Sequence, residues 1–254
     1  MLLCATVVGK RKLKNKKKVN NLKKTKYLFL FLAVALLILA VPLVFLLNYY
    51  NLIPKKNYTA KDFNIKTVKS QVDFDGDGID DYRDIMLGAR EDAQNRPKYK
   101  SEYYNNAYPP DNIGVCTDVV WRAFKNAGYD LRAMVSKDID ENTSDYPNVD
   151  KPDNNIDFRR VKNLRVFFDK YATILTTDTE KIEEWQAGDI VIFNNNSHIG
   201  IVSDKRNRQG KAYIIHNGGQ PNREEDYLSR STVVAHYRFD ASKLEADFLE
   251  KWQN

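Results

Sequence analysis

One segment near the N-terminus constrains the fold of this chain more than any other. From Tyr27 to Leu47 the sequence runs for 21 residues without a charged side chain. A helix rises about 1.5 Å per residue, so this segment is long enough to cross a hydrocarbon core of about 30 Å. The apolar part of a cleavable signal peptide is shorter, about 7–15 residues, and ends at a small-x-small site. We therefore expect an uncleaved transmembrane anchor, with an unusually long signal sequence as the alternative.

The charges on either side of this segment predict its orientation. Residues 1–54 contain ten Lys or Arg and no Asp or Glu, whereas residues 55–254 contain 30 basic and 34 acidic side chains, a net charge of −4. The positive-inside rule predicts that residues 1–26 form a cytoplasmic arm and that residues 48–254 lie outside, as in a single-pass protein of the cell membrane. Because the excess of positive charge belongs to the arm, the sequence gives no reason to expect a nucleic-acid partner.

The part of the chain beyond the anchor has two different hydrophobic patterns. Apolar side chains recur with helical period in its first half and alternate with period two in its second half, which predicts helices followed by an antiparallel meander and therefore an α+β fold. We expect a tether over residues 48–70, an Asp/Gly loop and helix over 71–96, and one domain over 97–254. The expected helices cover 82–96, 114–128, 130–138, 158–171 and 241–252, and the expected strands cover 189–193, 198–203, 212–217 and 232–239.

The chain has two cysteines, Cys4 and Cys116, which the predicted topology places on opposite sides of the membrane. They cannot pair, so a disulfide scaffold is excluded. Cys116 falls in the first turn of an expected amphipathic helix. The free amides and the dipole of a helix start favour a thiolate. A lone exported cysteine of this kind is either a buried, inert side chain or a nucleophile.

Three histidines accompany this thiol: His198, His216 and His236. His198 opens one expected strand and His216 lies near the end of the next, so the two imidazoles come close on one face if these strands pair as a hairpin. A cysteine with two histidines supplies a nucleophile, a general base and an orienting group. A zinc site would lack a visible fourth ligand, so no catalytic cofactor is expected. His236 alternates with Val234 and Arg238 and is interpreted as structural.

The order of these motifs resembles a known family. A helix that begins with Cys, then WQAGDIVIFNNNSHIGIVSD, then YIIHN is similar to the NlpC-type cell-wall cysteine peptidases, which have a papain-like core. The resemblance implies that Cys116 is the nucleophile on a helix packed against an antiparallel sheet, that His198 is the base and that His216 orients it. The stretch 73–239 also resembles a bacterial exported family of YijF type, which is mostly catalogued as a domain of unknown function and thought to be NlpC-like.

The chain departs from the NlpC pattern around the cysteine. The usual Cys-Ser-Gly is here Cys116-Thr117-Asp118, and Asp118 would oppose thiolate formation if it lay close to the sulfur. The family often has an upstream tyrosine that helps the oxyanion site, and Tyr108 is the candidate, at a loose spacing. These departures leave the substrate specificity open.

An acidic loop precedes the first helix of the domain. Residues 73–84 contain six Asp and one Arg, and Gly78 stands where the sharp turn of a calcium loop needs it. The loop also resembles the DxDGDGxxD loops of extracellular calcium-binding repeats, and we expect a weak structural calcium site. The last ligand is Asp rather than Glu and there is no second loop, so a turn and N-cap cluster is the alternative. The expected ligands are Asp73, Asp75, Asp77, the carbonyl of Ile79, Asp81 and Asp84.

The leading hypothesis is a membrane-anchored, extracytoplasmic cysteine hydrolase of amide bonds. Cell-wall peptide is the expected substrate, from the family resemblance and the predicted location alone. One alternative keeps the site but changes the chemistry, to a papain-like acyltransferase or a lipid or small-amide hydrolase. Another is a non-catalytic, calcium-stabilised module that binds the wall or a partner. The sequence does not define the bond that is cleaved or the oligomeric state.

Overall fold

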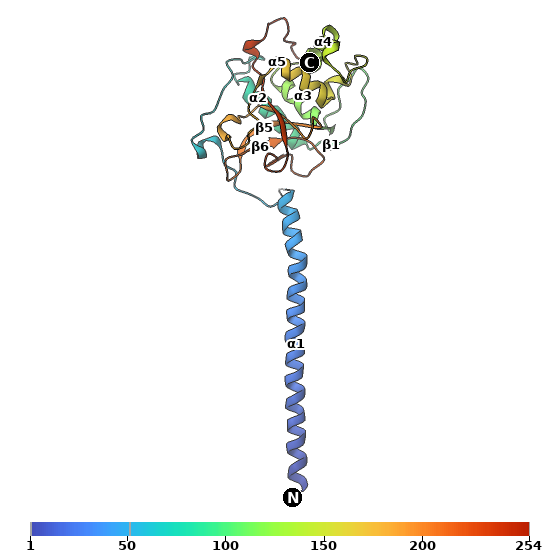
Figure 1. Ribbon diagram of the computed structural model, residues 1–254, viewed down its shortest axis with the longest axis vertical. Helices are drawn as coiled ribbons and strands as arrows, with labels where there is room; N and C mark the ends of the chain where they lie inside the picture. The colour runs from blue at the N-terminus through green and yellow to red at the C-terminus, as the bar shows by residue number, and fades with distance from the viewer. Residues whose placement is uncertain (1, 51, 254) are drawn as a thin grey trace. The chain divides into compact units, whose positions relative to one another are not determined.

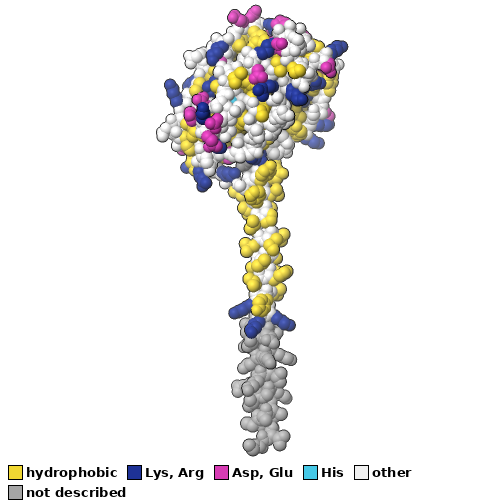
Figure 2. All heavy atoms as spheres, in the orientation of Figure 1, with side chains coloured by type: hydrophobic (Ala, Val, Ile, Leu, Met, Phe, Trp, Pro, Cys, Tyr) yellow, Lys and Arg dark blue, Asp and Glu magenta, His cyan; other side chains and the backbone are white. Residues whose placement is uncertain are grey.

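The chain divides into two units, Met1–Ile53 and Pro54–Asn254. The computed structural model describes residues 2–50 and 52–253, and the side chains among them from residue 23 onward. The first unit is a single helix, α1 (Leu2–Tyr49), with Pro42 inside it. Its part from Lys23 to Tyr49 is long and apolar enough to cross a membrane, and an 18-residue stretch within it has a mean hydropathy of 3.2. Hydrophobic side chains cover this part, as Figure 2 shows, and none of it is buried within the protein.

The second unit is an α+β fold (Figure 1), as the sequence predicts. Its sheet is antiparallel and six-stranded in the order β3-β8-β4-β5-β6-β7, and a separate parallel pair joins β1 to β2. The α-helices are α2 (Asp81–Asn95), α3 (Cys116–Asn126), α4 (Leu131–Glu141) and α5 (Val161–Tyr171). The strands are β1 (Lys98–Tyr99), β2 (Ile113–Gly114), β3 (Thr173–Ile174), β4 (Ile190–Phe193), β5 (His198–Arg206), β6 (Ala212–Ile215), β7 (Glu224–Glu225) and β8 (Val233–Arg238). Short 3-10 turns are η1 (Ala60–Phe63), η2 (Thr143–Asp145), η3 (Asp157–Arg159), η4 (Ile182–Glu184) and η5 (Ala241–Lys243).

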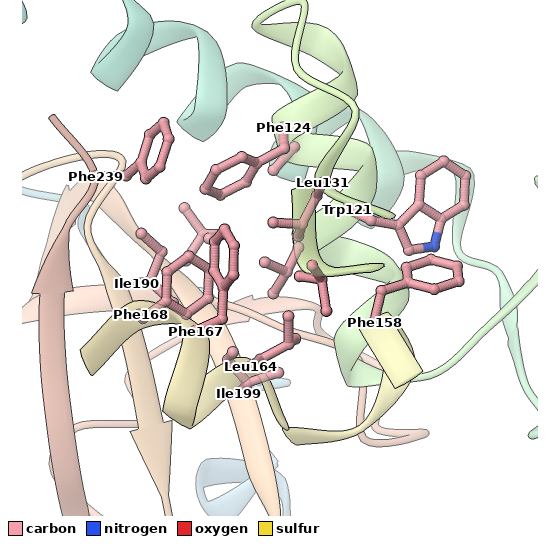
Figure 3. Close-up of a cluster of buried hydrophobic side chains, with 14 of the residues drawn as sticks. Trp121, Phe124, Leu131, Phe158, Leu164, Phe167, Phe168, Ile190, Ile199 and Phe239 are labelled. Carbon is pink, nitrogen blue, oxygen red and sulfur yellow. The ribbon is translucent and has the colours of Figure 1, made fainter. Parts of the chain in front are cut away.

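The sheet is buried on both faces, which explains the continuous apolar run of β4. Successive side chains of a strand point to opposite faces, and here they join two different clusters. Ile190 and Ile192 pack with the helices in the larger cluster, whereas Val191 and Phe193 pack in a smaller one on the other face. Figure 3 shows the first face, where side chains of α3, α4 and α5 meet those of β4 and β5. The residues labelled there are Trp121, Phe124, Leu131, Phe158, Leu164, Phe167, Phe168, Ile190, Ile199 and Phe239.

A tight turn of three asparagines sets the register between β4 and β5. Asn194, Asn195 and Asn196 all have positive φ, between 51° and 61°, a conformation that asparagine tolerates better than most residues. The Ser197 hydroxyl donates to the Asn194 carbonyl at 2.6 Å. The turn pairs Phe193 with His198, so the sequence NNNS places a histidine at the first position of β5.

The segment predicted as a tether is part of the second unit from Pro54 onward. Tyr58 and Arg206 exchange two backbone hydrogen bonds, of 3.1 and 2.7 Å. The Val68 amide donates to the Gln186 side chain at 3.1 Å. The expected 71–96 segment also shares the main core with the rest of the unit, because α2 contributes Ile85 to it. Residues 54–254 therefore form one unit rather than a tether and two further parts.

The amphipathic helix predicted over 241–252 is wrong. Only the short turn η5 (Ala241–Lys243) forms there. The Asp130 amide donates to the Glu250 carbonyl at 2.8 Å, and the Trp252 amide donates to the Gly128 carbonyl at 2.7 Å. These bonds to the α3–α4 connection replace the helical bonds of the last residues. The apolar period that suggested a helix instead packs this irregular segment onto the core.

Candidate functional site

Cys116 is the first residue of α3, and a buried ion pair fixes this helix start. Asp118 accepts hydrogen bonds from the Val115 amide at 2.7 Å and from the Trp121 ring N–H at 2.8 Å. Its two carboxylate oxygens also bind the Arg159 guanidinium, with Nε and Oδ1 2.7 Å apart. Asp118 is fully buried, so its charge depends on this arginine partner. The departure from the Cys-Ser-Gly pattern is thus explained by helix capping and by the ion pair.

The Cys116 thiol is protonated at neutral pH. Its residue is 6% exposed, and burial raises the pKa of the thiol to about 11. Backbone N–H groups of Ile199 and Thr117 act in the opposite direction and lower this pKa, whereas the charge of Asp118 raises it. The amides at the helix start therefore act as the sequence predicts, but the thiolate they favour is outweighed by desolvation. Nucleophilic attack from this position requires a base that removes the proton during the attack.

His198 and His216 lie in direct contact. β5 and β6 pair with Ile201 opposite Ile215, so the two histidines are diagonal neighbours on one face of the hairpin. The distance between Nε2 of His198 and Nδ1 of His216 is 2.8 Å, and the rings are nearly perpendicular, at 88°. Gly200 permits this approach, because a Cβ there would lie 2.7 Å from the Ile214 side chain and 3.0 Å from Cβ of His216.

Both imidazoles of this pair are neutral near pH 7. Burial lowers the pKa of His198 to about 3, and the charge of His216 lowers it further in the same direction. Burial also lowers the pKa of His216, although its hydrogen bond to Glu225 opposes this effect. A neutral imidazole has one N–H and one acceptor nitrogen. The contact between the rings is therefore a single N–H···N hydrogen bond.

Glu225 extends the pair to a third buried group that the sequence analysis missed. Its Oε1 lies 3.1 Å from Nε2 of His216, and the Arg230 guanidinium binds the same oxygen. Glu225 is fully buried, whereas its neighbour Glu224 turns the other way and binds Arg90 at 2.6 Å. The two-residue strand β7 lies in a charged run without an apolar pattern. Nothing in that run distinguishes one glutamate from the other.

The thiol and the imidazole pair reach the same end of β5. The Ile199 amide that hydrogen-bonds the Cys116 sulfur belongs to the residue directly after His198. In the described part of the chain, no hydrogen bond joins this sulfur to His198 or His216. The structure thus brings the two histidines into contact and Cys116 beside their strand, with the sulfur–imidazole bond not made.

Tyr108, the predicted oxyanion residue, makes its contacts with other groups than the thiol. Its hydroxyl donates to the Asp130 carboxylate at 2.9 Å, and its ring packs against Trp121 and Trp252. Tyr99 is the tyrosine whose pKa depends on the thiol: partial burial raises this pKa, and a negative charge on Cys116 raises it further. Tyr99 was not predicted because it belongs to the two-residue strand β1, which has no sequence period.

The acidic loop gathers three of the predicted calcium ligands. Carboxylate oxygens of Asp73, Asp75 and Asp77 lie within 4.8 Å of one another, and the side chains are exposed. In the part of the chain that the structure describes, this is the one group of three such ligands, and Cys116, His198 and His216 do not form another. Asp81 packs inward, where it accepts from the Tyr129 hydroxyl at 2.7 Å. Asp84 is buried as well and accepts from the Asn126 amide, and calcium binding through this loop stays a prediction.

His236 lies in a second buried cluster on the same sheet. Its Nε2 faces the Asp189 carboxylate at 3.0 Å, and its Nδ1 faces the Thr176 carbonyl at 2.8 Å. The ring stacks on Trp185, with centroids 3.9 Å apart, and Arg238 binds both oxygens of Asp189. Every polar atom of this histidine is used by the protein, as the structural interpretation from sequence expects.

The fold and this site define an α+β domain with a cysteine at a helix start and a pair of contacting histidines on a neighbouring hairpin. Residues 86–239 match the model of a domain of unknown function, DUF1287, and the chain belongs to that family. The chain is similar to the uncharacterized protein YijF of Escherichia coli (strain K12), with 38% identity over 165 residues that cover 61% of this chain and 80% of that protein. No solved structure matches the chain.

Proposed function

We propose that this protein is a membrane-anchored, extracytoplasmic cysteine hydrolase of amide bonds with a papain-like arrangement of Cys116, His198 and His216. The observation that carries the proposal is the 2.8 Å contact between the two imidazoles at the end of the strand whose Ile199 amide faces the Cys116 sulfur. Family membership adds no activity, because the family and its relative are uncharacterized.

The protonation states define how such a site would work. A thiol pKa of about 11 and a His198 pKa of about 3 favour a neutral thiol–imidazole pair at rest. His198 therefore takes the thiol proton as the sulfur attacks the amide carbonyl carbon, and backbone N–H groups at the helix start stabilise the oxyanion. The imidazolium then protonates the leaving amine as the C–N bond breaks. A water molecule, deprotonated by His198, attacks the thioester and releases the acid and the thiol. The sulfur–imidazole bond would tighten when substrate binds, as catalytic hydrogen bonds often do.

A groove of about 510 Å³ lies beside the turn that precedes His198. Its walls are formed by the segment between α4 and α5, by the start of α5 and by the asparagine turn. Its lining is mostly polar, which suits a peptide backbone better than a lipid chain. This location supports a substrate-facing role for the loop over 141–155. The lining residues are Pro147, Asn148, Asp150, Arg160, Val161, Lys162, Asn196 and Ser197.

The charges around α1 support the proposed orientation of the chain in the membrane, and this orientation in turn supports the proposed substrate. Lys23, Lys24 and Lys26 flank the apolar segment at its N-terminal end, so the positive-inside rule favours a cytoplasmic N-terminus and an external C-terminal unit. Cell-wall peptide is the amide substrate that this location and the NlpC resemblance favour.

The test is amide release by the full-length chain in lipid nanodiscs with peptidoglycan fragments, with Cys116→Ala as the control. New amino groups should appear with the native chain, and the variant should lose at least about 10³-fold in rate. Added amine acceptors distinguish the acyltransferase alternative, which predicts acyl–acceptor products in place of free acid. Equal release by the native chain and the variant would remove the proposal.

Burial of the thiol favours a second candidate, a non-catalytic module that binds the wall or a partner. The 6% exposure of Cys116 and its raised pKa fit an inert core residue. The two imidazoles also contact Tyr227, which packs on the cluster opposite the one that contains Cys116. Sedimentation of the protein with insoluble wall material that is equal for the native chain and Cys116→Ala, without product release, would support this candidate.

A further inference from the structure

Glu225, His216 and His198 form a continuous chain of hydrogen-bonding atoms. A carboxylate offers only acceptors, and Oε1 of Glu225 already accepts from the Arg230 guanidinium. Nε2 of His216 lies 3.1 Å from that oxygen. Because an acceptor facing an acceptor would be repulsive in a fully buried position, Nε2 of His216 must be the nitrogen that carries the proton.

The proton on His216 determines the proton on His198. Burial keeps His216 neutral, so with Nε2 protonated its Nδ1 is an acceptor. Nε2 of His198, 2.8 Å from that atom, must therefore donate. The amide nitrogen of Gln220 lies 3.2 Å from both Nδ1 and Nε2 of His216, so this contact does not distinguish the two tautomers. A neutral His198 with Nε2–H has its lone pair on Nδ1.

We propose that Glu225 is a positioning residue that holds both imidazoles in the Nε2–H tautomer and so makes Nδ1 of His198 the basic nitrogen of the site. Among the described residues, the hydrogen bonds of His198 involve Nε2 and leave Nδ1 without a protein partner. The role of this nitrogen as the acceptor of the Cys116 proton rests on the proposed function. The tautomers themselves do not depend on it.

The groups that face His216 come from several elements, and all of them bear on its protonation. His198 approaches from β5 and Glu225 from β7, while Arg223, Arg230 and Tyr227 surround the ring from the connecting loops. The two arginines disfavour an imidazolium and Glu225 favours one. The environment therefore supports a neutral His216 whose single proton is directed by one carboxylate.

The test is the tautomeric state of each histidine, read from long-range ¹H–¹⁵N spectra of full-length protein labelled with ¹⁵N-histidine in nanodiscs at pH 7. The chain has only three histidines, and His198→Gln and His236→Gln variants assign the signals. We expect protonated Nε2 and unprotonated Nδ1 for both His198 and His216. A protonated Nδ1 on either ring in the native chain would overturn the proposal.

Variants separate positioning by Glu225 from a general loss of structure. Glu225→Gln retains an acceptor oxygen for His216 and Arg230, so both tautomers should persist, whereas Glu225→Leu removes it and both rings should show mixed tautomers. Asp189→Leu is the matched control for Glu225→Leu, because Asp189 binds His236 and Arg238 on the same sheet as Glu225 binds His216 and Arg230. It should change only the His236 signals. Unmixed Nε2–H tautomers in folded Glu225→Leu would also overturn the proposal.

Amide release distinguishes this inference from the proposed function. If the native chain shows the expected tautomers but no amide release, the hydrolase proposal is rejected and the positioning role of Glu225 stands. Amide release with a protonated Nδ1 on His198 would remove the role of Glu225 and leave the hydrolase. If the native chain shows both the expected tautomers and amide release, the release rate should fall by about 10²–10⁴-fold in Glu225→Leu, because a correctly oriented base is lost. Glu225→Gln should retain part of the native rate.

Discussion

Two buried clusters on the same sheet each contain a carboxylate, an arginine and a histidine. Their hydrogen-bond chains end on different kinds of group. In one, His236 lies between Asp189 and a backbone carbonyl, with Arg238 on the carboxylate. In the other, His216 lies between Glu225 and a second imidazole, with Arg230 on the carboxylate. In the first cluster the chain of hydrogen bonds ends on the carbonyl oxygen of Thr176, which can only accept. The second ends on His198, which has a further nitrogen to offer.

This difference separates a structural histidine from a candidate base. A buried carboxylate, an arginine and a histidine satisfy one another's hydrogen bonds in both places. Only the second cluster passes the orientation of its histidine on to another titratable ring, beside a cysteine at a helix start. Composition and burial are thus poor guides to function here, and the last atom of each hydrogen-bond chain is the informative one.

Substitution of one histidine in each cluster should give the largest difference between them. His198→Gln should reduce amide release by about 10²–10⁴-fold, because the general base is lost, with little change in unfolding temperature. His236→Gln should lower the unfolding temperature, because two buried hydrogen bonds and a stacked ring are lost. Its rate per folded molecule should stay close to the native value. Rates of release and thermal melts of both variants check this, and a catalytic loss confined to His236→Gln would reverse the assignment.

The reactivity of Cys116 tests whether the second cluster faces a protonated thiol. With a pKa of about 11, the thiolate fraction rises about tenfold per pH unit below that value. The alkylation rate with iodoacetamide should therefore rise about 10³-fold between pH 7 and pH 10. Peptide mass spectrometry at Cys116 isolates this thiol from Cys4. A rate that is already maximal below pH 8 would show a stabilised thiolate and contradict the burial argument.

The dependence of stability on pH should distinguish His198 as a neutral buried base. Its folded pKa of about 3 lies below the ordinary histidine value of 6.5, so the unfolded chain binds the proton more readily. Stability from this group is present above pH 6.5 and is lost as the pH falls toward 3. The free energy of unfolding should decline less over that window in His198→Gln than in the native chain, in urea titrations at each pH. Parallel curves would contradict the lowered pKa.

The Asp/Gly loop extends the comparison to carboxylates without a cationic partner. Glu225 and Asp189 each bind an arginine, whereas no Lys, Arg or His ion pair to Asp73, Asp75 or Asp77 exists in the described part of the chain. Calcium in the millimolar range should therefore raise the unfolding temperature by a few degrees, about the effect of 1 kcal/mol or less. Chelator should reverse it, and Asp75→Asn should weaken it. If calorimetry shows no heat of calcium binding and no shift in the unfolding temperature, only the turn and N-cap interpretation of the loop remains.

Much of the fold could be predicted because local sequence and tertiary structure agree. The apolar run of α1, the apolar stripe of α3 and the short apolar runs of β4, β5 and β6 each specify one element, and the NNNS turn sets the hairpin register. The residues after 243 show where this reasoning fails. Their period is helical, yet Glu250 and Trp252 bond to the α3–α4 connection. A one-dimensional pattern does not contain such long-range backbone pairing.

The site was predictable only where a motif places a residue on a regular strand. His198 and His216 meet because two strands of known period form a hairpin. Glu225 and Tyr99 lie on two-residue strands, and their positions depend on packing that has no period. The thiol pKa was expected to be low from the helix start alone. The burial that raises it comes from the core around α3, which no local pattern reports.

Trapping the acyl-enzyme would identify the nucleophile of the proposed hydrolase. Full-length protein mixed with a peptidoglycan-derived peptide amide and acid-quenched within seconds should show, by mass spectrometry, a thioester adduct on the Cys116 peptide equal in mass to the acyl part of the substrate. Product release with no adduct, unchanged in Cys116→Ala, would contradict the assignment of this sulfur as the nucleophile.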